Sequence, residues 1–489
     1  MEQELRRLPD GTYTGAMTDE HICGIFGCCG DWNRREVRIG ALTVYVYAID
    51  GITSGGDASE YVVKPLMQDA FGGTMDELYD RALHRTVYNS VAVPCGDLQS
   101  TAEKLVNGFT VVLFGQRAIA FETKTGEKRS PSAPEVENTV KGPKDAFTET
   151  VRTNTSLLRR HLRTPALRLY ETVVGRRSLT NVTLVWIDGL TDPALVQRMQ
   201  ARLAEIDIDG LLTPAAVEEY LTGSRPTAFP LLQYTERTDR FAQALLEGRA
   251  GLFVDGLPLG YLAPVDLGYL MTSAEDRGTD FVSASFLRVL RYAALLLGLL
   301  LPGLYVAMAA FHPQMLPTEL LQSILESKRA VPFPTIVEVL GLLAAFELLQ
   351  EASVSLPQSV GQSLSIIGGL VVGSAAVEAR LISPAALIVV AAAGICGFAI
   401  PGRSFADALR VWRMALAAAA SLAGLFGLTL GAICLVVHLA GLDSFGISYL
   451  APFSGIGGAR ALLRPRLVRE PLRDPLLRPL DRRNQGEKR

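Results

Sequence analysis

The sequence lacks the short motifs by which many enzymes are identified. Its 489 residues contain no G-x-G-x-x-G fingerprint, phosphate-binding loop, nucleophile elbow or zinc signature. It also lacks an excess of positive charge, because the net charge is −3, and this argues against a nucleic-acid-binding protein. The segment Met1–Glu20 is charged and has no apolar centre, so we expect no secretory signal and a cytoplasmic N-terminal region.

Cysteine is scarce, with six residues in the chain. Cys23, Cys28 and Cys29 lie close to His21 in the sequence, but their spacing matches no tetrahedral metal site. We therefore expect free thiols in a reducing compartment, with neither a bound metal nor a cofactor.

Charged residues are missing from four long apolar stretches in the second half of the chain. Each stretch reaches the roughly 20 residues that a helix needs to cross the hydrocarbon core of a membrane. Gly and Ala are frequent in them, as is typical of helices that pack closely in lipid. We therefore predict an α-helical transmembrane bundle. The four stretches are Tyr292–Pro317, Ala352–Val377, Leu381–Gly402 and Met414–Leu442.

The first half of the chain contains a pattern that occurs twice. The β-rich runs Leu42–Ile49 and Val182–Ile187 each end in Asp-Gly, and a segment of helical character follows each of them. The strand-like runs Val111–Phe114 and Leu252–Val254 come at similar distances downstream. Apolar β-branched runs that alternate with helices indicate α/β layering, and the similar spacing indicates duplication. The prediction is an α/β soluble N-terminal region with two tandem related subdomains.

The aspartates of the two Asp-Gly pairs, Asp50 and Asp188, fit turns, because Asp and Gly together satisfy turn geometry. An Asp at a strand end can also bind a metal or act as a base. An enzyme acting through Asp50, Asp188 or Asp209 is therefore an open alternative. Further on, the run Asp192–Ile206 begins with Asp-Pro, which predicts an N-cap followed by Pro at the first helical position.

A polar segment of helical character, Asp145–Arg160, lies between the two copies. Its residues Arg152, Arg159 and Arg160 could grip another subunit or a phosphate group, because arginine makes strong charge-assisted hydrogen bonds. A solvated helix face is the alternative. We treat the three arginines as candidate subunit contacts.

The run Pro334–Glu351 differs from the four apolar stretches because it carries acidic residues. An amphipathic segment of this length suits a re-entrant or interfacial helix. Ionisable side chains within a membrane domain are costly and usually face water or a partner. Glu338 and Glu347 are therefore candidates for an ion path.

The second of the apolar stretches carries polar side chains although it is uncharged. Buried polar groups are costly in lipid, so Gln362, Ser365 and Ser374 are further candidates for a water-filled ion path. Glycines four residues apart let helix backbones approach closely, so we treat Gly369 and Gly373 as candidate subunit contacts. Packing within one bundle is the alternative.

The C-terminal tail from Arg460 to Arg489 holds ten Lys or Arg and four acidic residues. Basic residues favour the cytoplasmic side of a membrane, so we expect the tail to be cytoplasmic, like the N-terminal region. The number of crossings is then even, and four fits the four stretches. This topology leaves Arg403, Arg410 and Arg413 outside, against the usual preference.

Many short runs occur in an order that one protein family shares. They are Gly142–Asn154, Val174–Arg177, Trp186–Gly189, Ile206–Gly210, Phe229–Pro230, Gln233–Arg237, Pro317–Leu320, Val331–Pro334, Gly361–Gln362 and Phe398–Pro401. Through them the chain closely resembles the GerA-type spore germination proteins, the A subunits of spore germinant receptors. The resemblance runs from about Leu105 to Pro452. One departure is Leu343, where the family often has Glu.

The resemblance implies a nutrient (germinant) receptor subunit in the inner membrane of a bacterial spore. Such subunits form homo-oligomers, as pentamers, and act as nutrient-gated ion channels that release ions at germination. The implied partners are a transporter-like B subunit, a lipoprotein C subunit and the lipid bilayer, without nucleic acid. One alternative is an accessory germination channel of the same family that amplifies the signal without sensing nutrients. Another is a secondary transporter, which would need inverted repeats that we do not detect in the sequence.

These observations divide the chain into five expected parts. They are a variable N-terminal segment (1–36), a first cytoplasmic α/β subdomain (37–135), a helical linker with a second cytoplasmic α/β subdomain (136–280), a polytopic membrane domain (281–445) and a basic, Pro-containing cytoplasmic tail (446–489).

Overall fold

The chain divides into two compact units, which we call the α/β unit and the helical unit. The α/β unit comprises residues 1–225, 231–264 and 468–489, and the helical unit comprises residues 226–230 and 265–467. The computed structural model describes residues 4–8, 11–68, 73–125, 133–137, 139, 141–223, 226–354, 373–454, 462–464, 466 and 472–484.

The α/β unit contains two copies of one arrangement of helices and strands. The first copy has α1 (Asp19–Phe26), β3 (Trp32–Ile39), β4 (Leu42–Ile49), α2 (Gly55–Asp57), η1 (Ala58–Val63), α3 (Lys64–Gln68), α4 (Met75–Arg81), η2 (Ala82–Thr86), β5 (Ala92–Cys95), α5 (Leu98–Val106), β6 (Phe109–Phe114) and β7 (Arg117–Glu122). The second has α6 (Val151–His161), β8 (Leu167–Val174), β9 (Thr180–Ile187), α7 (Pro193–Ala204), α8 (Pro214–Thr222), β10 (Gln233–Thr235), α9 (Thr238–Glu247), β11 (Ala250–Val254) and β12 (Gly260–Ala263). A short pair, β1 (Arg6–Arg7) and β2 (Tyr13–Thr14), precedes both.

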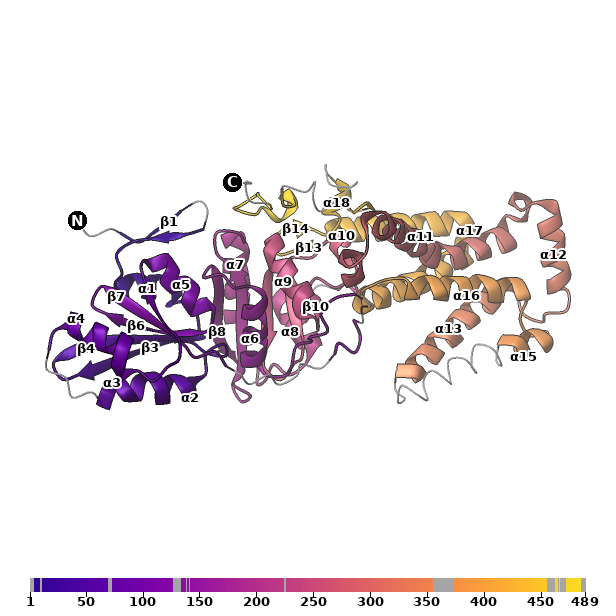
Figure 1. The fold of residues 1–489 in the computed structure, drawn as a ribbon. Helices are drawn as coiled ribbons and strands as arrows, with labels where there is room; N and C mark the ends of the chain where they lie inside the picture. Colours follow the sequence, from indigo (N-terminus) through magenta and orange to yellow (C-terminus); the bar gives the residue numbers. More distant parts are fainter. Residues whose placement is uncertain are drawn as a thin grey trace. The chain divides into compact units, whose positions relative to one another are not determined.

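Each copy forms a five-stranded antiparallel sheet, and the strand order is the same in both. The orders are β3-β4-β6-β7-β5 and β8-β9-β11-β12-β10. Figure 1 shows the first sheet in indigo and violet and the second in magenta. Two sheets with one order of strands and helices are the expected product of a duplication, so the prediction of two tandem related subdomains is confirmed.

The first sheet is covered by helices on both faces. Helices α1 and α5 pack on one face through residues such as Phe26 and Leu105, while α3 and α4 cover the other with Leu66 and Leu78. Strand β6 is buried at every position, as expected for a strand between two helical layers. The apolar run read from the sequence therefore marks the centre of a three-layer structure.

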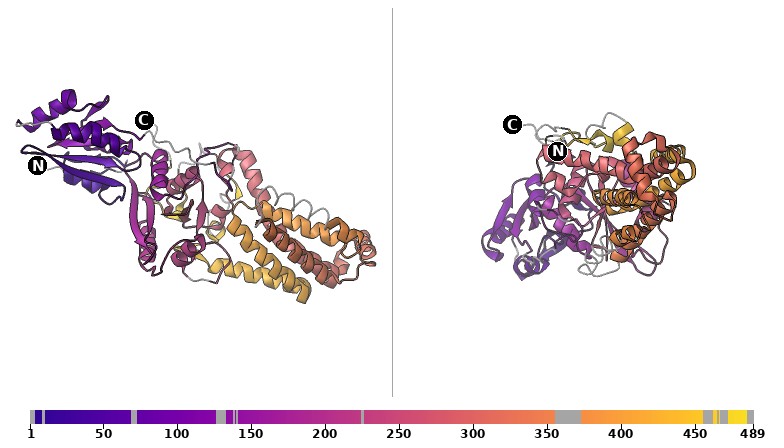
Figure 2. Two further views of the ribbon diagram at one scale, coloured as in Figure 1. Left: turned by 90° about the horizontal axis from the view of Figure 1, so that it is seen from below. Right: turned by 90° about the vertical axis from the view of Figure 1, so that its right-hand side faces the viewer.

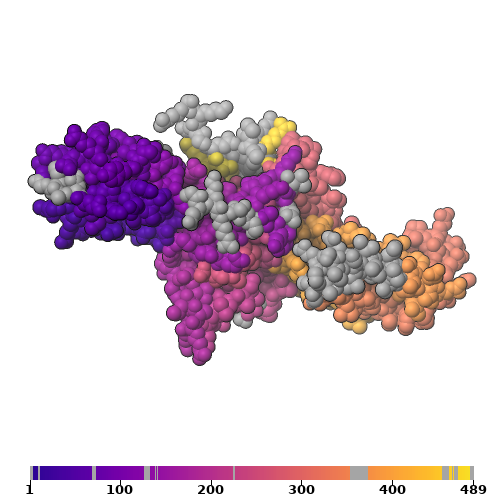
Figure 3. Space-filling view, turned by 60° about the horizontal axis from the view of Figure 1, so that its bottom comes forward, coloured from indigo at the N-terminus to yellow at the C-terminus, as the bar shows by residue number. Residues whose placement is uncertain are grey.

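The N-terminal residues belong to the first copy rather than to a separate segment. Helix α1 is capped by Thr18, whose hydroxyl accepts the His21 N–H, and its residues Ile22 and Phe26 are 1% exposed. The boundary that we expected after residue 36 falls inside β3. In the space-filling view the indigo segment is part of the same lobe as the violet residues that follow it (Figure 3).

Local signals in the second copy produced the predicted elements. Asp192 caps α7, which begins with Pro193 and ends at Ala204. The Asp-Gly pairs are turns, since Gly51 and Gly189 have φ of +85° and +72°, a conformation that glycine adopts without strain.

The C-terminal residues return to the α/β unit. The Leu480 N–H donates to the Leu190 carbonyl (2.9 Å), and Arg473 Nε donates to the Leu246 carbonyl (2.9 Å). A short turn, η8 (Pro475–Leu477), lies between these two contacts. Residues 472–484 are thus part of this unit, and the helical unit is inserted between β12 and them.

The helical unit consists mainly of long helices that run beside one another (Figure 2). Two of its described helices are long and apolar enough to cross a membrane, over residues 281–311 and 403–441, and the helix over 384–398 is apolar but shorter. Its elements are α10 (Leu267–Leu270), η3 (Ala274–Arg277), α11 (Phe281–Val306), η4 (Ala307–Phe311), η5 (Pro313–Met315), α12 (Thr318–Lys328), α13 (Thr335–Val354), α15 (Gly373–Glu378), α16 (Pro384–Phe398), α17 (Arg403–Gly441), β13 (Asp443–Ser444), β14 (Ile447–Ser448) and α18 (Ala451–Ser454).

Helix α17 is folded back on itself as a tight hairpin. Ala423 and Gly424 leave the helical conformation, and Gly424 has φ +61° and ψ −137°. A Cβ placed on Gly431 would lie 2.7 Å from Leu416 Cδ2, although a straight helix would hold these residues about 22 Å apart. Trp412 and His438 likewise have ring centroids 5.6 Å apart. The single span expected over 414–442 is therefore wrong, because the chain reverses at its centre.

The hairpin changes the expected position of three arginines. Its tip lies against the end of the first long helix, since a Cβ on Gly424 would be 3.0 Å from Phe311 Cβ. Both arms consequently point their other ends toward the start of α11. Arg403, Arg410 and Arg413 are on the first arm, so they lie toward the end where α11 begins and not at the opposite end, as our four-span topology required.

The start of α11 is fixed by a buried charge cluster. Asp276 is 1% exposed and accepts from Arg291 (2.7 and 2.8 Å) and from Arg288 Nε (3.2 Å). Burial by itself raises the pKa of Asp276, but the hydrogen bonds and charges of the two arginines outweigh it and lower the pKa. The carboxylate is therefore ionised and holds the first turns of the helix.

Candidate functional site

Glu338 lies in the first turn of α13 and is only 3% exposed. Its Oε1 accepts the backbone N–H of Ser383, the N-cap residue of α16. Ser383 in turn accepts the Ala386 N–H through its hydroxyl (3.4 Å) and is fully buried. The carboxylate of one helix thus faces the positive end of another, where a negative charge is stabilised.

The second oxygen of Glu338 has a different environment. Oε2 is buried and makes no hydrogen bond to any atom of the described residues. The hydroxyl of Tyr305, which is 7% exposed, lies beside Ser383 and interacts with its side chain. A carboxylate oxygen of Glu338 and the hydroxyl of Tyr305 therefore both lie around the start of α16.

Glu347, farther along α13, is fully paired. It accepts from Arg410 Nε (2.6 Å) through Oε2 and from Arg413 Nη2 through Oε1. Arg413 is 4% exposed and also donates to the Ala393 carbonyl (3.2 Å). The two candidate ion-path carboxylates thus differ, because Glu347 is paired with two arginines of α17 while Glu338 has one oxygen without a hydrogen bond among the described residues.

The remaining candidates on the second apolar stretch are only partly within the described residues. Ser374 is exposed on α15. Gly373 is buried, and a Cβ there would lie 3.6 Å from Leu387 Cδ2 of the same chain. Gln362, Ser365 and Gly369 lie outside the described residues, so their roles stay predictions.

Leu343, where the resemblance leads one to expect Glu, lies inside the helical unit. It is 1% exposed and belongs to an apolar cluster with Tyr305, Val339 and Val390. The only acidic side chain of this α13 face that the structure places near Tyr305 is therefore Glu338, one helical turn and a residue earlier in the chain.

The three candidate arginines of α6 have different environments. Arg159 is 1% exposed and pairs with Asp31, equally buried, through Nε–Oδ2 and through Nη2–Oδ1 at 2.8 Å. It joins the two copies of the α/β unit, which corrects its assignment as a surface contact for another subunit. Arg152 bridges Glu171 (2.9 Å) and Asp50 (3.2 Å) at the surface, and Arg160 is exposed.

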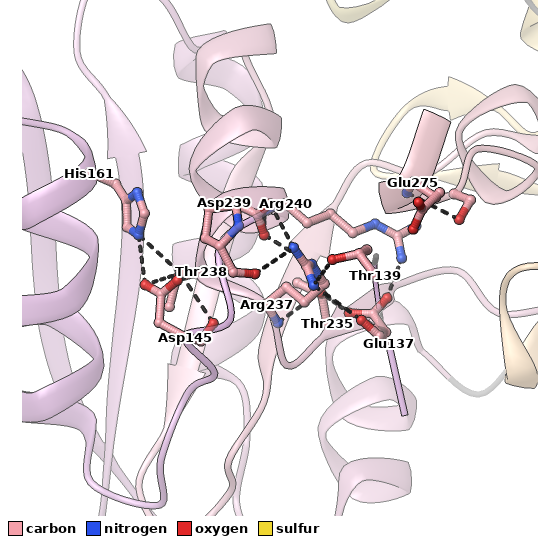
Figure 4. Close-up of polar contacts among 12 residues, drawn as sticks. Glu137, Thr139, Asp145, His161, Thr235, Arg237, Thr238, Asp239, Arg240 and Glu275 are labelled. Atoms are coloured by element: carbon pink, nitrogen blue, oxygen red, sulfur yellow. Dashed lines mark hydrogen bonds and ion pairs between the residues drawn. The ribbon is translucent and has the colours of Figure 1, made fainter. Parts of the chain in front are cut away.

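Two of the family-like runs meet around Arg237. This residue is 1% exposed, and its guanidinium donates to Asp239 (3.0 and 2.9 Å), to Thr139 Oγ1 (2.9 Å) and to the carbonyls of Glu137 (3.2 Å) and Pro143 (3.0 Å). Figure 4 shows Arg237 between these groups. The segment that connects the two copies is thereby clamped to the second sheet. Spacing in the sequence gave no signal for this contact, because the partners are nearly a hundred positions apart.

A histidine, an aspartate and a threonine meet next to this clamp, but not as a catalytic relay. His161 Nε2 lies 2.8 Å from Asp145 Oδ2 and 3.0 Å from Thr238 Oγ1. A relay needs the acid and the nucleophile on opposite ring nitrogens, whereas both contacts here use Nε2. The hydrogen bond with His161 lowers the pKa of Asp145 to about 2, and the same bond raises the pKa of His161. The group is an ion pair that holds α6.

The aspartates of the enzyme alternative are occupied by arginines. Asp188 pairs with Arg168 (3.1 Å) and Arg7 (3.2 Å), and Asp209 pairs with Arg177 (3.4 Å). Among the described residues no group of three or more His, Cys, Asp or Glu side chains could hold a metal ion.

Comparison with known proteins identifies relatives of this chain. The chain matches the family model "Bacillus/Clostridium GerA spore germination protein" over residues 20–480. It is 36% identical over 430 residues to YfkQ, described as an uncharacterized membrane protein, of Bacillus subtilis (strain 168), which covers 87% of this chain and 83% of that protein. It is 35% identical over 452 residues to spore germination protein KA of the same strain, covering 90% of this chain and 82% of that protein.

Among solved structures, the chain resembles the N-terminal domain of the A subunit of a Bacillus megaterium spore germinant receptor. The two are 26% identical with a TM-score of 0.40, and the match covers 54% of this chain and 97% of that domain. The family match spans nearly the whole chain, and relatives above 30% identity cover most of it. This chain therefore belongs to the Bacillus/Clostridium GerA spore germination protein family.

Proposed function

We propose that this chain is the A subunit of a spore nutrient germinant receptor, and that copies of it assemble in the spore inner membrane as a nutrient-gated ion channel. A transporter-like B subunit and a lipoprotein C subunit complete the receptor, and the α/β unit faces the cytoplasm. Relatives named as spore germination proteins support the receptor role. The apolar helix over residues 281–311 and the apolar helical hairpin over residues 403–441 support the membrane location.

The observation that carries the channel proposal is the pair of carboxylates on α13. Glu338 and Glu347 lie about 13 Å apart along the helix axis, inside a mostly apolar helical unit. Ionisable groups at such positions are costly and are retained where they serve transport or pairing. Glu347 is paired with two arginines, whereas Glu338 has an oxygen available to a passing cation.

The test is ion release from spores in which this gene carries single substitutions. We expect Glu338→Gln or Gln362→Leu to slow nutrient-triggered release of potassium, measured with an ion-selective electrode, while the amount of receptor in the membrane is unchanged. Glu326→Gln, an exposed change on α12, is the matched control and should release ions like the wild type. Normal release in both test variants would remove these residues from the path.

The accessory-channel alternative makes a different prediction about partners. A receptor A subunit should lose nutrient-triggered release when the transporter-like and lipoprotein genes are deleted. An accessory channel should still amplify release that another receptor starts. Saturable nutrient uptake by vesicles that contain this chain alone would instead indicate a secondary transporter.

A further inference from the structure

The carboxylate of Glu338 is divided between a satisfied and an unsatisfied oxygen. Oε1 is held by the Ser383 N–H, so the side chain cannot rotate freely. Oε2 is buried and has no hydrogen-bond partner among the described residues. A buried polar atom left unpaired is costly, and the cost is higher for a charged group such as a carboxylate than for a neutral one. The arrangement is therefore stable only if something else compensates that oxygen.

Part of the compensation comes from α16. Its N-terminus, which carries about half a positive charge, faces the carboxylate through Ser383. This favours the ionised form of Glu338 and fixes the direction of its other oxygen. The Ala386 N–H is bonded to the Ser383 hydroxyl (3.4 Å), and Oε2 makes no hydrogen bond to any backbone N–H of the described residues.

A second oxygen ligand is available nearby. The Tyr305 side chain is buried beside Ser383 and packs in one cluster with Val339, which follows Glu338, and with Ala386 of α16. Carboxylate and hydroxyl oxygens are hard ligands, which suit hard metal cations. Among the described residues Glu338 is the one acidic side chain that interacts with Tyr305, and a single negative charge matches a monovalent ion better than a divalent one.

A tethered cation of the protein lies close to the same place. Lys328 ends α12, and its ammonium is 5.9 Å from the centre of the Tyr305 ring. Burial lowers the pKa of Lys328, and the charge of Glu338 partly offsets this effect. The ammonium is thus near enough for the charge of Glu338 to act on it, yet Glu338 Oε2 accepts no hydrogen bond from any described residue, Lys328 included.

We propose that Glu338 Oε2 and the Tyr305 hydroxyl bind a monovalent inorganic cation, and that the Lys328 ammonium replaces this cation when it leaves. The inference rests on the proposed channel function, to which it adds the class of ion and the place where the ion pauses. Lys328 acts here as a competitor, so the site alternates between a free cation and a cation carried by the protein. Such an exchange keeps the carboxylate compensated in both states.

The test is binding of radioactive rubidium to the purified full-length protein in detergent. Saturable binding is expected for the wild type, and Glu338→Gln should weaken it at least about tenfold, equivalent to about 1.4 kcal/mol. Tyr305→Phe should weaken it less, because it removes a neutral ligand. Glu326→Gln removes the same charge from the exposed face of α12 and should bind like the wild type. Absence of saturable binding, or equal binding by Glu338→Gln, would overturn the proposal.

Lys328→Met provides an independent arm if Glu338→Gln does not fold. Removing a competing ammonium should raise rubidium affinity several-fold, whereas Lys328→Arg should keep it low. Unchanged or weaker binding in Lys328→Met would contradict the exchange. Rubidium binding without nutrient-triggered ion release from spores would sink the receptor function and leave the site, while normal release without rubidium binding would sink only the site.

Discussion

The buried carboxylate of Glu338 in the helical unit differs from two buried arginines of the α/β unit in how its charge is compensated. In the α/β unit Arg159 and Arg237 are each 1% exposed, and each faces an opposite charge, Asp31 or Asp239. In the helical unit Glu338 is almost as buried, but its bonded partner is a neutral backbone N–H and one oxygen is left over. Pairing with an opposite charge fixes a structure, because separation leaves a bare charge in a medium of low polarity. Incomplete pairing leaves a charge that can be exchanged.

The largest effect should come from breaking the pair between the two copies. Asp31→Ala leaves Arg159 buried without its carboxylate, and removing one partner of a buried pair costs about 3–5 kcal/mol. We expect a large fall in the midpoint of thermal unfolding of the detergent-purified protein, as measured by intrinsic fluorescence. Arg152→Ala, which removes a surface bridge, should cost less than about 1 kcal/mol. Equal effects of the two variants would show that the buried pair is not a structural lock.

A smaller loss is expected within the helical unit from Glu347→Gln. The change leaves the buried Arg413 with the Ala393 carbonyl, while Arg410 keeps Asp407 at 2.7 Å. Since Glu347 is 26% exposed, we expect about 1–3 kcal/mol rather than the full cost of a buried pair. The same thermal measurement checks this. A larger loss of stability than that caused by Asp31→Ala would show that the ion pair of the helical unit contributes more than the buried pair of the α/β unit.

Glu338→Gln should change stability by less than about 1 kcal/mol, or even stabilise the protein. Its amide oxygen can still accept the Ser383 N–H, and the uncompensated charge is removed. A difference between this variant and Glu347→Gln would sharpen the contrast between an exchangeable and a paired carboxylate on one helix. A loss as large as that of Glu347→Gln would mean that Glu338 is a structural residue.

The smallest effect should be a pH dependence at His161 and Asp145. The raised pKa of His161 means that its contribution is fully present below about pH 6.5 and is lost as pH rises through the folded-state pKa. The lowered pKa of Asp145, about 2, means that its contribution is present above about pH 4 and is lost as pH falls toward 2. The free energy of unfolding of the wild type, measured by denaturant titration, should therefore exceed that of His161→Gln by up to about 1 kcal/mol near pH 5.5 and by less at pH 8.5.

Local chemistry made the α/β fold readable from the sequence. Asp-Pro at Asp192 predicted the start of α7, and the apolar run Leu42–Ile49 predicted β4, because caps and strand periodicity depend on residues close in the chain. The N-terminal helix α1 was missed because its core residues lie among Gly and Cys, which weaken a helical pattern. Its burial depends on the sheet that follows it.

The candidate site could be read only in part. Carboxylates on α13 were visible as charges in an apolar region, and Ser383-Pro384 carried a helix-start signal that could have been used. The partners were not visible, since Glu338 and Ser383 are 45 positions apart and Glu347 and Arg413 are 66 apart. The hairpin in α17 was missed because length alone cannot tell one long helix from two that a glycine joins.

Residues 472–484 belong to the α/β unit, so the helical unit is an insertion in the sequence of the α/β unit. The Leu190 carbonyl accepts the Leu480 backbone N–H, and the Leu246 carbonyl accepts a hydrogen bond from Arg473 Nε. A premature stop codon just before residue 472 would thus remove these two hydrogen-bond donors from the α/β unit. Adding a peptide of residues 472–489 to the truncated protein could restore these two hydrogen bonds.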